Sequence, residues 1–372
     1  MILSVALWVS LLIPAAPVAA QDAVDDRLAS ARAAVGRQNF EQAENTFRAL
    51  IADHPGLADA YAGLADALLG QSRADEAFAT LMTVGQGLVE SGEVDSGTNF
   101  LERAVRLKPN SSAGNAALGG ALLRANRHRQ ARTHLEAAIE LGETEPIVRL
   151  FLAAAQWESG AYDEAQQTYR EILLVPGPTA DAARRSLGAL LLFRGEYASA
   201  VPMLAAAVGG AAESAQVRYD LACALEGAGR TAEATELLAL IVADHPRFIQ
   251  AHFRLARLLQ VSGHPDRANR HMQIFQQLHL EQQRETRELG LVEAQLKQGW
   301  HWLREGRHDQ ARGLFSSLPE TPDALSGLAE ASRRGGDLDA AVSALRRALE
   351  LDPERFDLRL TLDEILIEAG SR

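Results

Sequence analysis

Histidine pairs are the first residues in this sequence whose type and spacing could bind a metal ion. His128 and His134 stand six residues apart, and His301 and His308 lie on either side of Gly306. Neither pair has a cysteine or carboxylate at a recognisable spacing to complete a zinc site. No histidine stands in an HExxH arrangement. We therefore predict polar turn and surface histidines and no metal site.

Carboxylate pairs and one cysteine are the other candidates for catalysis. Asp75-Glu76 and Asp163-Glu164 each begin a predicted helix, where negative charge suits the helix dipole, so we interpret them as structural. Cys223 is either an inert buried thiol or a residue of a binding groove. The sequence has no GxGxxG after a strand, no phosphate loop and no GxSxG. We therefore predict no catalytic residues, no cofactor and no enzyme activity.

Composition narrows the class of protein and its partners. The chain has 372 residues, of which 47% are hydrophobic, and its net charge is -12. An acidic chain without a cluster of Lys and Arg is poorly suited to nucleic acid, so we expect no nucleic-acid partner. Alanine and leucine are abundant, and both favour helices. β-branched and aromatic residues are sparse, which argues against an extensive sheet.

The N-terminal stretch resembles a secretory signal. Met1–Ala20 has no charged side chain, is interrupted by Pro14 and Pro17, and ends in small residues before Gln21. We predict cleavage after Ala20 and export, to the periplasm or cell envelope or as a secreted protein. The alternative is a retained membrane anchor, because the apolar length almost suffices to span a bilayer. No later stretch approaches that length, so we expect no stable membrane insertion after signal removal.

A helix-turn-helix pattern recurs along the chain. In Leu152–Tyr169, a first helix ends at Gly160, and Tyr162, Ala165 and Tyr169 mark one face of a second helix. Equivalent alanines of successive second helices are 34, 35, 34 and 34 residues apart: Ala131, Ala165, Ala200, Ala234 and Ala268. A chance pattern would lose this register within two or three units. The sequence therefore predicts an array of helix pairs.

This pattern resembles the tetratricopeptide repeat, in which two antiparallel helices per 34-residue unit stack into a superhelix. The resemblance implies an all-α fold, an α-solenoid superhelix of about nine to ten tetratricopeptide repeats. We assign residues 1–20 to the signal peptide, residues 24–353 to the repeat array and residues 354–372 to a C-terminal capping helix. In this last helix we expect Leu358, Leu362 and Leu366 to form the apolar face.

The register breaks at two places. Only 20 residues separate Ala65 from Gly85, which we interpret as one long helix from Ala74 to Glu90 that serves two units. Between Ala268 and Ala311 there are 43 residues, and the extra segment is polar and free of proline. This second segment reads either as an extended solvated helix or as a protruding helix-loop.

The resemblance also implies where a partner would bind, because such arrays usually bind along the concave surface lined by first helices. The equivalent positions here form the predicted partner-binding groove: Leu150, Trp157, Arg185, Phe193, Tyr219, Phe253, Arg257, Trp300 and Arg304. Tryptophan, tyrosine and arginine dominate binding hot spots. The alternative is that these side chains fill gaps between helices. A clamp for chaperone tails is not supported, because its Lys and Asn positions hold other residues.

Together these patterns predict a role in recognition rather than catalysis. We expect an exported, non-catalytic protein-protein interaction scaffold that binds a peptide or protein partner along the concave face. The alternative is an accessory subunit of a cell-envelope enzyme or of a polysaccharide assembly and export machine.

Overall fold

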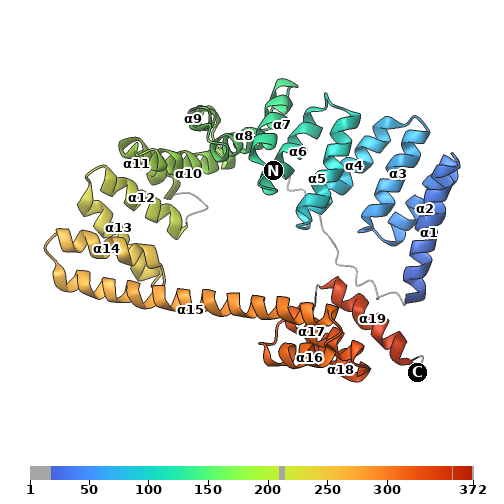
Figure 1. Cartoon of the computed structure of the whole chain (residues 1–372). Coiled ribbons are helices and arrows are strands. Elements are labelled where there is room, and N and C mark those ends of the chain that lie inside the picture. Colours follow the sequence, from blue (N-terminus) through green and yellow to red (C-terminus); the bar gives the residue numbers. More distant parts are fainter. Residues whose placement is uncertain (1–17, 209–213, 354, 371–372) are drawn as a thin grey trace. The chain divides into compact units, whose positions relative to one another are not determined.

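The computed structural model describes residues 18–208, 214–353 and 355–370. Every regular element in these ranges is a helix, which confirms the all-α prediction (Figure 1). The predicted signal segment lies almost wholly outside the described residues. In chain order the helices are α1 (Val18–Gly36), α2 (Phe40–Asp53), α3 (Ala58–Gly70), α4 (Ala74–Glu90), α5 (Val94–Leu107), α6 (Ser112–Arg124), α7 (His128–Glu140), α8 (Pro146–Glu158), α9 (Tyr162–Ile172), α10 (Pro178–Phe193), α11 (Tyr197–Val208), α12 (Ala215–Gly227), α13 (Thr231–Asp244), α14 (Ile249–Val261), α15 (Pro265–Arg304), α16 (His308–Ser317), α17 (Pro322–Arg334), α18 (Leu338–Leu351) and α19 (Phe356–Gly370).

The residues divide into two compact units, which we describe separately. The larger unit is Leu28–His279, and the smaller unit is Leu280–Arg372 together with Met1–Arg27. Among the described helices, none combines the length and the apolar composition needed to cross a membrane.

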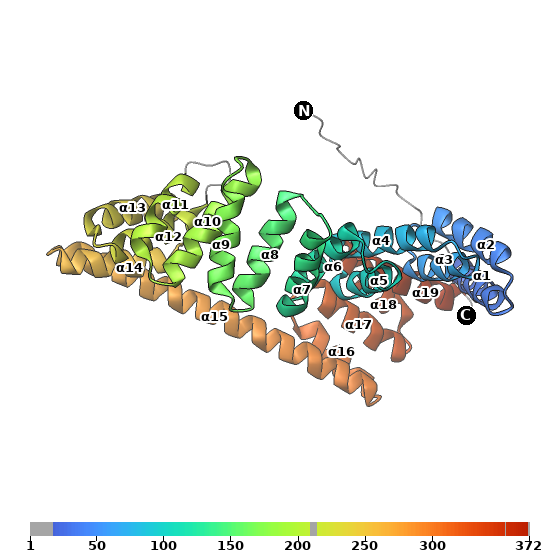
Figure 2. The same ribbon diagram turned by 90° about the horizontal axis from the view of Figure 1, so that it is seen from above.

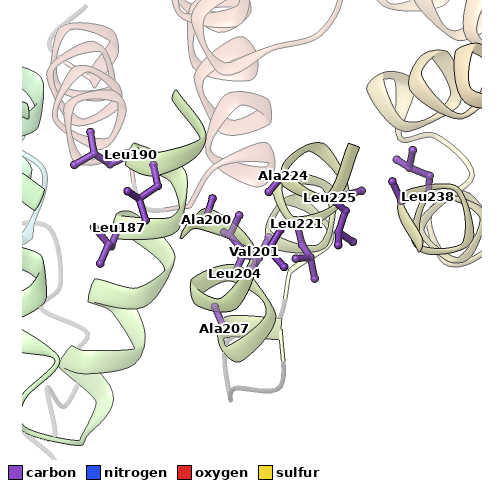
Figure 3. Close-up of a cluster of buried hydrophobic side chains, with 14 of the residues drawn as sticks. Leu187, Leu190, Ala200, Val201, Leu204, Ala207, Leu221, Ala224, Leu225 and Leu238 are labelled. Carbon is purple, nitrogen blue, oxygen red and sulfur yellow. The ribbon is translucent and has the colours of Figure 1, made fainter. Parts of the chain in front are cut away.

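In the larger unit, consecutive helices pack side by side and bury their apolar faces against one another (Figure 2). Figure 3 shows part of this core, where Val201 and Leu204 of α11 lie beside Leu221 of α12. Burying one such side chain stabilises the fold by about 1.5–3 kcal/mol. Because each helix buries side chains against both the preceding and the following helix, no pair is complete without its neighbours.

Small residues stand where the two helices of a pair cross. A Cβ atom on Gly188 of α10 would lie 2.6 Å from Cγ of Leu204 on α11. Ala153 and Ala222 hold the same position on α8 and α12, and both are fully buried. Small residues therefore recur along the sequence at the spacing at which the two helices of each pair cross.

The first register break is a helix that belongs to two pairs. Helix α4 spans Ala74–Glu90, as predicted, and packs against both α3 and α5. Its Gly85 faces Gly97 of α5, where an added Cβ would lie 2.6 Å from the Gly85 carbonyl oxygen and 2.6 Å from Cγ2 of Val89. The two glycines thus let the backbones of α4 and α5 approach closely.

The second register break is also a helix that belongs to two pairs. Helix α15 is a single uninterrupted helix of 40 residues (Figures 1 and 2), so the extended-helix interpretation is confirmed and the helix-loop is wrong. Ala268 near its start is buried in the core of the larger unit, and Leu303 near its end is buried in the smaller unit. Between these ends, Leu280, Leu289 and Leu291 are exposed.

In the smaller unit, one aromatic ring packs against two glycines. Phe315 of α16 fills the space above two glycines, because a Cβ on Gly299 or Gly327 would lie 2.4 Å or 2.3 Å from its ring. Helices α17 and α18 then form a further pair. With α4 and α15 each counted in two pairs, the described residues contain ten pairs and a last helix, as the repeat count predicted.

The last helix, α19, packs against α18. The predicted face is only partly right, because Leu358 and Ile365 are buried whereas Leu366 is 40% exposed. Leu362 and Ala369 are partly buried against the same cluster. The apolar face follows the spacing i, i+4, i+7 and i+11 from Leu358, which keeps it on one side of a 3.6-residue helix.

The glycine contact between α4 and α5 leads to a first prediction. Gly97→Ala should lower the free energy of unfolding by about 1–3 kcal/mol, because the new Cβ meets backbone that cannot move aside. Gly87→Ala is the matched control on α4, since a Cβ there meets nothing within 4 Å. That control should stabilise the protein by up to about 1 kcal/mol through helix propensity. Denaturant unfolding followed by circular dichroism measures both, and equal behaviour of the two variants would contradict the close approach.

Candidate partner-binding surface

The first helices of successive pairs in the larger unit form one layer. Contacts run from α6 to α8, from α8 to α10 and from α10 to α12, and side chains of α12 reach α14. We call α8, α10, α12 and α14 the first-helix layer. Seven predicted groove residues lie on it: Leu150 and Trp157 on α8, Arg185 and Phe193 on α10, Tyr219 on α12, and Phe253 and Arg257 on α14.

Some of these side chains are part of the packing. Leu150, Trp157 and Tyr219 are partly buried and pack against the apolar core of the larger unit. They fit the alternative of filling gaps between helices. Each nevertheless keeps part of its surface exposed.

Two phenylalanines of the layer are exposed to solvent. Phe193 is 64% exposed, and its ring centroid lies 5.3 Å from that of Tyr162 at the start of the preceding helix, α9. Phe253 is 39% exposed, and its ring lies 5.0 Å from that of Phe275. These rings can therefore contact a partner without any rearrangement of the core.

Trp300 and Arg304 lie at the end of α15, beyond the first-helix layer. Trp300 is partly buried and meets Phe315 edge-on, with ring centroids 5.6 Å apart. Arg304 is exposed. Their role in binding stays a prediction, and Trp300 has an evident packing role.

A polar cluster joins α12 to α14. The guanidinium of Arg254 donates to Oε2 of Glu226 at 2.5 Å and to the hydroxyl of Tyr219 at 3.3 Å. It also lies 5.6 Å from the centroid of the Tyr219 ring, a distance suited to a cation–π contact. Arg257 approaches the other oxygen of Glu226 at 3.8 Å. The ring of Phe248, just before α14, also contacts Tyr219, with ring centroids 5.3 Å apart.

Arg254, Glu226 and Phe248 are not among the groove residues predicted from the sequence. Arg254 stands one residue after the predicted groove position held by Phe253, and its side chain contacts α12, the first helix of the preceding pair. Glu226 stands 28 residues earlier and is three residues beyond Cys223. An acid and a base at facing positions of successive first helices are the sequence signal that would have indicated this pairing.

Cys223 lies beside this cluster and is mostly buried, with 8% of its surface exposed. Burial raises the pKa of its thiol to about 11. The same cause raises the pKa values of the neighbouring Tyr219 and Asp220 above their usual ranges. Because the thiolate is the reactive form, this environment favours the inert thiol over the groove residue.

One histidine of each candidate pair has a polar partner, whereas the buried Nδ1 atoms of His128 and His308 have none among the described residues. Nδ1 of His134 lies 2.9 Å from Oδ1 of Asn115, whose amide nitrogen donates to the Pro109 carbonyl at 2.8 Å. Burial lowers the pKa of His134. His301 contacts Glu305 at 3.2 Å. Within the described ranges, no three His, Cys, Asp or Glu residues gather in a way that could hold a metal ion.

The same hydrogen-bonding plan recurs on α14, where the sequence analysis missed it. Nε2 of His252 lies 3.0 Å from the Pro246 carbonyl, and its Nδ1 lies 3.1 Å from Nδ1 of His271. Since a carbonyl only accepts, we assign the proton of His252 to Nε2 and the shared proton to Nδ1 of His271. Burial, with the neighbouring His252, lowers the pKa of His271.

These features define an α-solenoid of antiparallel helix pairs with an accessible layer of first helices. Two family models, both described as tetratricopeptide repeat, match the chain. One matches residues 122–187 and 191–258, and the other matches residues 28–82 and 296–356. Together they cover more than half of the sequence, and the chain belongs to the tetratricopeptide-repeat family.

Several solved structures have a similar fold. MamA from Desulfovibrio magneticus RS-1 shares 22% identity over 46% of this chain and 96% of its own, with a TM-score of 0.44. A tetratricopeptide repeat protein from Parabacteroides merdae shares 15% identity over 78% of this chain and 98% of its own, with a TM-score of 0.44. YrrB, described as having an unusual peptide-binding site, shares 15% identity over 55% of this chain and 95% of its own, with a TM-score of 0.42. These likenesses concern the fold alone. A search of curated protein sequences found no match.

The burial of Cys223 leads to a second prediction. At any pH below about 9, the native protein should hold roughly 100-fold less thiolate than the unfolded chain, because its thiol pKa is about 11 rather than 9. Alkylation by iodoacetamide, followed by mass spectrometry with and without denaturant, measures this ratio. Equal rates in the two states would show that Cys223 is an accessible groove residue.

Proposed function

We propose that this protein is an exported, non-catalytic interaction scaffold that binds an extended peptide or protein segment on the first-helix layer. The observation that carries the proposal is the exposure of Phe193 and Phe253 on helices whose other faces are packed in the core. Only 5% of the chain is aromatic, and Phe193 and Phe253 are more exposed than the tyrosines Tyr162 and Tyr197 of the second helices. Exposed apolar rings on a rigid layer are typical of recognition sites.

The arrangement of the layer supports an extended ligand. Successive first helices pack about 8–10 Å apart, so each pair adds one more set of side chains along the layer. A ligand of about three residues in extended conformation spans the same distance. The repeated pairs therefore present repeated subsites to an unfolded segment rather than one deep pocket.

Family membership supports a non-catalytic role. The sequence contains none of the nucleophile, phosphate-loop or metal motifs sought above. The buried thiol of Cys223 is also unsuited to nucleophilic attack, because its pKa lies well above neutral pH.

A peptide-display experiment tests the binding role. Random twelve-residue peptides should yield ligands for the full chain, and Phe193→Ala should weaken the selected peptides at least about tenfold, because the exposed ring is lost from the site. Leu240→Ala is the matched control, since Leu240 is an exposed apolar side chain on the second helix α13. The measurement is fluorescence anisotropy with the purified variants.

Two outcomes would contradict this function. If no peptide is selected while purified envelope oligosaccharides bind the chain, the alternative of an accessory subunit for a polysaccharide machine is favoured. If the selected peptides lose affinity with Leu240→Ala and not with Phe193→Ala, a partner binds on the second helices instead.

Export rests on the sequence of Met1–Ala20, with its uncharged apolar run and small terminal residues. Expression of the full chain in a bacterium should give a product that begins at Gln21 and is released with the periplasmic fraction. Intact-mass spectrometry of the fractions measures this. A product that keeps residues 1–20 and sediments with membranes would support the anchor, and an unprocessed product in the cytoplasm would contradict export.

A further inference from the structure

The charge of the first-helix layer differs from that of the whole chain. Helices α10, α12 and α14 together carry five arginines and three acidic residues, whereas the chain has a net charge of -12. Positive charge is therefore concentrated on the helices that also carry the exposed phenylalanines. A positive surface attracts acidic partners.

Three of the five arginines are neutralised by neighbouring carboxylates. Arg184 pairs with Asp181, Arg218 pairs with Asp244 at 2.8 Å, and Arg254 pairs with Glu226 at 2.5 Å. On α10, α12 and α14, these pairs leave Arg185 and Arg257 as the two arginines with charge available to a ligand.

Arg185 and Arg257 have different surroundings. Arg185 has no ion-pair partner in the described part of the chain, and its side chain is partly exposed. Arg257 is 57% exposed, and its only carboxylate contact among the described residues is the long one of 3.8 Å to Glu226. Since Glu226 already receives the shorter bond from Arg254, it neutralises one of the two guanidinium groups. One positive charge therefore remains at Arg257.

The surroundings of Glu226 indicate which chemical group binds between α12 and α14. The Glu226 carboxylate lies between two guanidinium groups, and the nearer guanidinium also donates a hydrogen bond to Tyr219 and lies over its ring. The side chain of Glu226 therefore occupies a carboxylate-binding site that Arg254 and Arg257 form. A ligand carboxylate would bind next to Glu226, on the exposed side of Arg257.

We propose that the first-helix layer from α10 to α14 binds an acidic extended peptide segment, with one carboxylate at Arg257 and a second at Arg185. This inference rests on the proposed function and adds the chemistry of its ligand. Apolar side chains between the two acids would contact the exposed rings of Phe253 and Phe193. Two helix spacings separate α10 from α14, about 16–20 Å, which corresponds to five or six extended residues between the acids.

Two synthetic peptides test the charge requirement. The first is a fluorescein-labelled decapeptide with Glu at positions 2 and 8, Phe at positions 4 and 6 and Ser elsewhere, and the second replaces both Glu residues with Gln. The acidic peptide should bind the full chain at least about tenfold more tightly than its amide counterpart. Its affinity should fall with added salt, because exposed ion pairs are screened.

Variants of the chain assign the effect to residues. Arg257→Gln and Arg185→Gln should each weaken the acidic peptide about fivefold and leave the amide peptide unchanged. Glu226→Gln should strengthen the acidic peptide, because it removes the competing carboxylate and keeps the side-chain shape. Arg170→Gln is the control, since Arg170 is an exposed arginine on the second helix α9. Circular dichroism confirms that each variant is folded.

The outcomes separate this inference from the proposed function. If both peptides bind equally and both depend on Phe193, the layer binds peptides without a charge preference, and the inference is overturned while the function stands. If the acidic peptide binds but Arg170→Gln weakens it as much as Arg257→Gln does, the attraction is non-specific and the inference also fails. If neither peptide binds, the inference is wrong, and the display experiment decides the function.

Discussion

The close crossing of helices at small residues is the constraint on which the rest of this structure depends. Gly188 allows Leu204 to lie directly on the α10 backbone, and Gly85 and Gly97 allow the backbones of α4 and α5 to approach closely. Larger residues at these points would push the helices apart and expose the leucines that pack between them. Since each helix is packed on both sides, one faulty crossing affects the neighbouring pairs as well.

This constraint also explains how the array tolerates its two register breaks. Helix α4 presents Ala77 to one neighbour and Gly85 to the next, so one helix supplies two crossings. Helix α15 does the same over a longer span, with Ala268 buried near one end and Gly299 beneath Phe315 near the other. The number of residues between successive crossings changes at both places, but a small residue still lies at each crossing.

Much of this fold could be predicted from the sequence, because alanine and glycine recur at the spacing of the helix crossings. This pattern also predicted the span of α4. The same pattern did not decide between an extended helix and a helix-loop for α15, because the central residues of this helix are polar on most faces and lie at no helix crossing. The burial of Ile365 in place of Leu366 was missed, since both residues suit an apolar face and only packing against α18 separates them. Arg254 was missed because it binds to α12, the first helix of the preceding pair, and such a contact depends on the angle between pairs.

The proposed binding role depends on which helix faces are buried in the core and which remain exposed to a partner. First and second helices both bury apolar faces in the core, and the first helices also keep Phe193, Phe253 and Arg257 accessible. The most direct test of this role is amide hydrogen exchange by mass spectrometry, with and without a display-selected peptide. The account predicts slower exchange in α10, α12 and α14 upon binding, with α11 and α13 unchanged. Slower exchange confined to α11 and α13, or to the smaller unit, would contradict it.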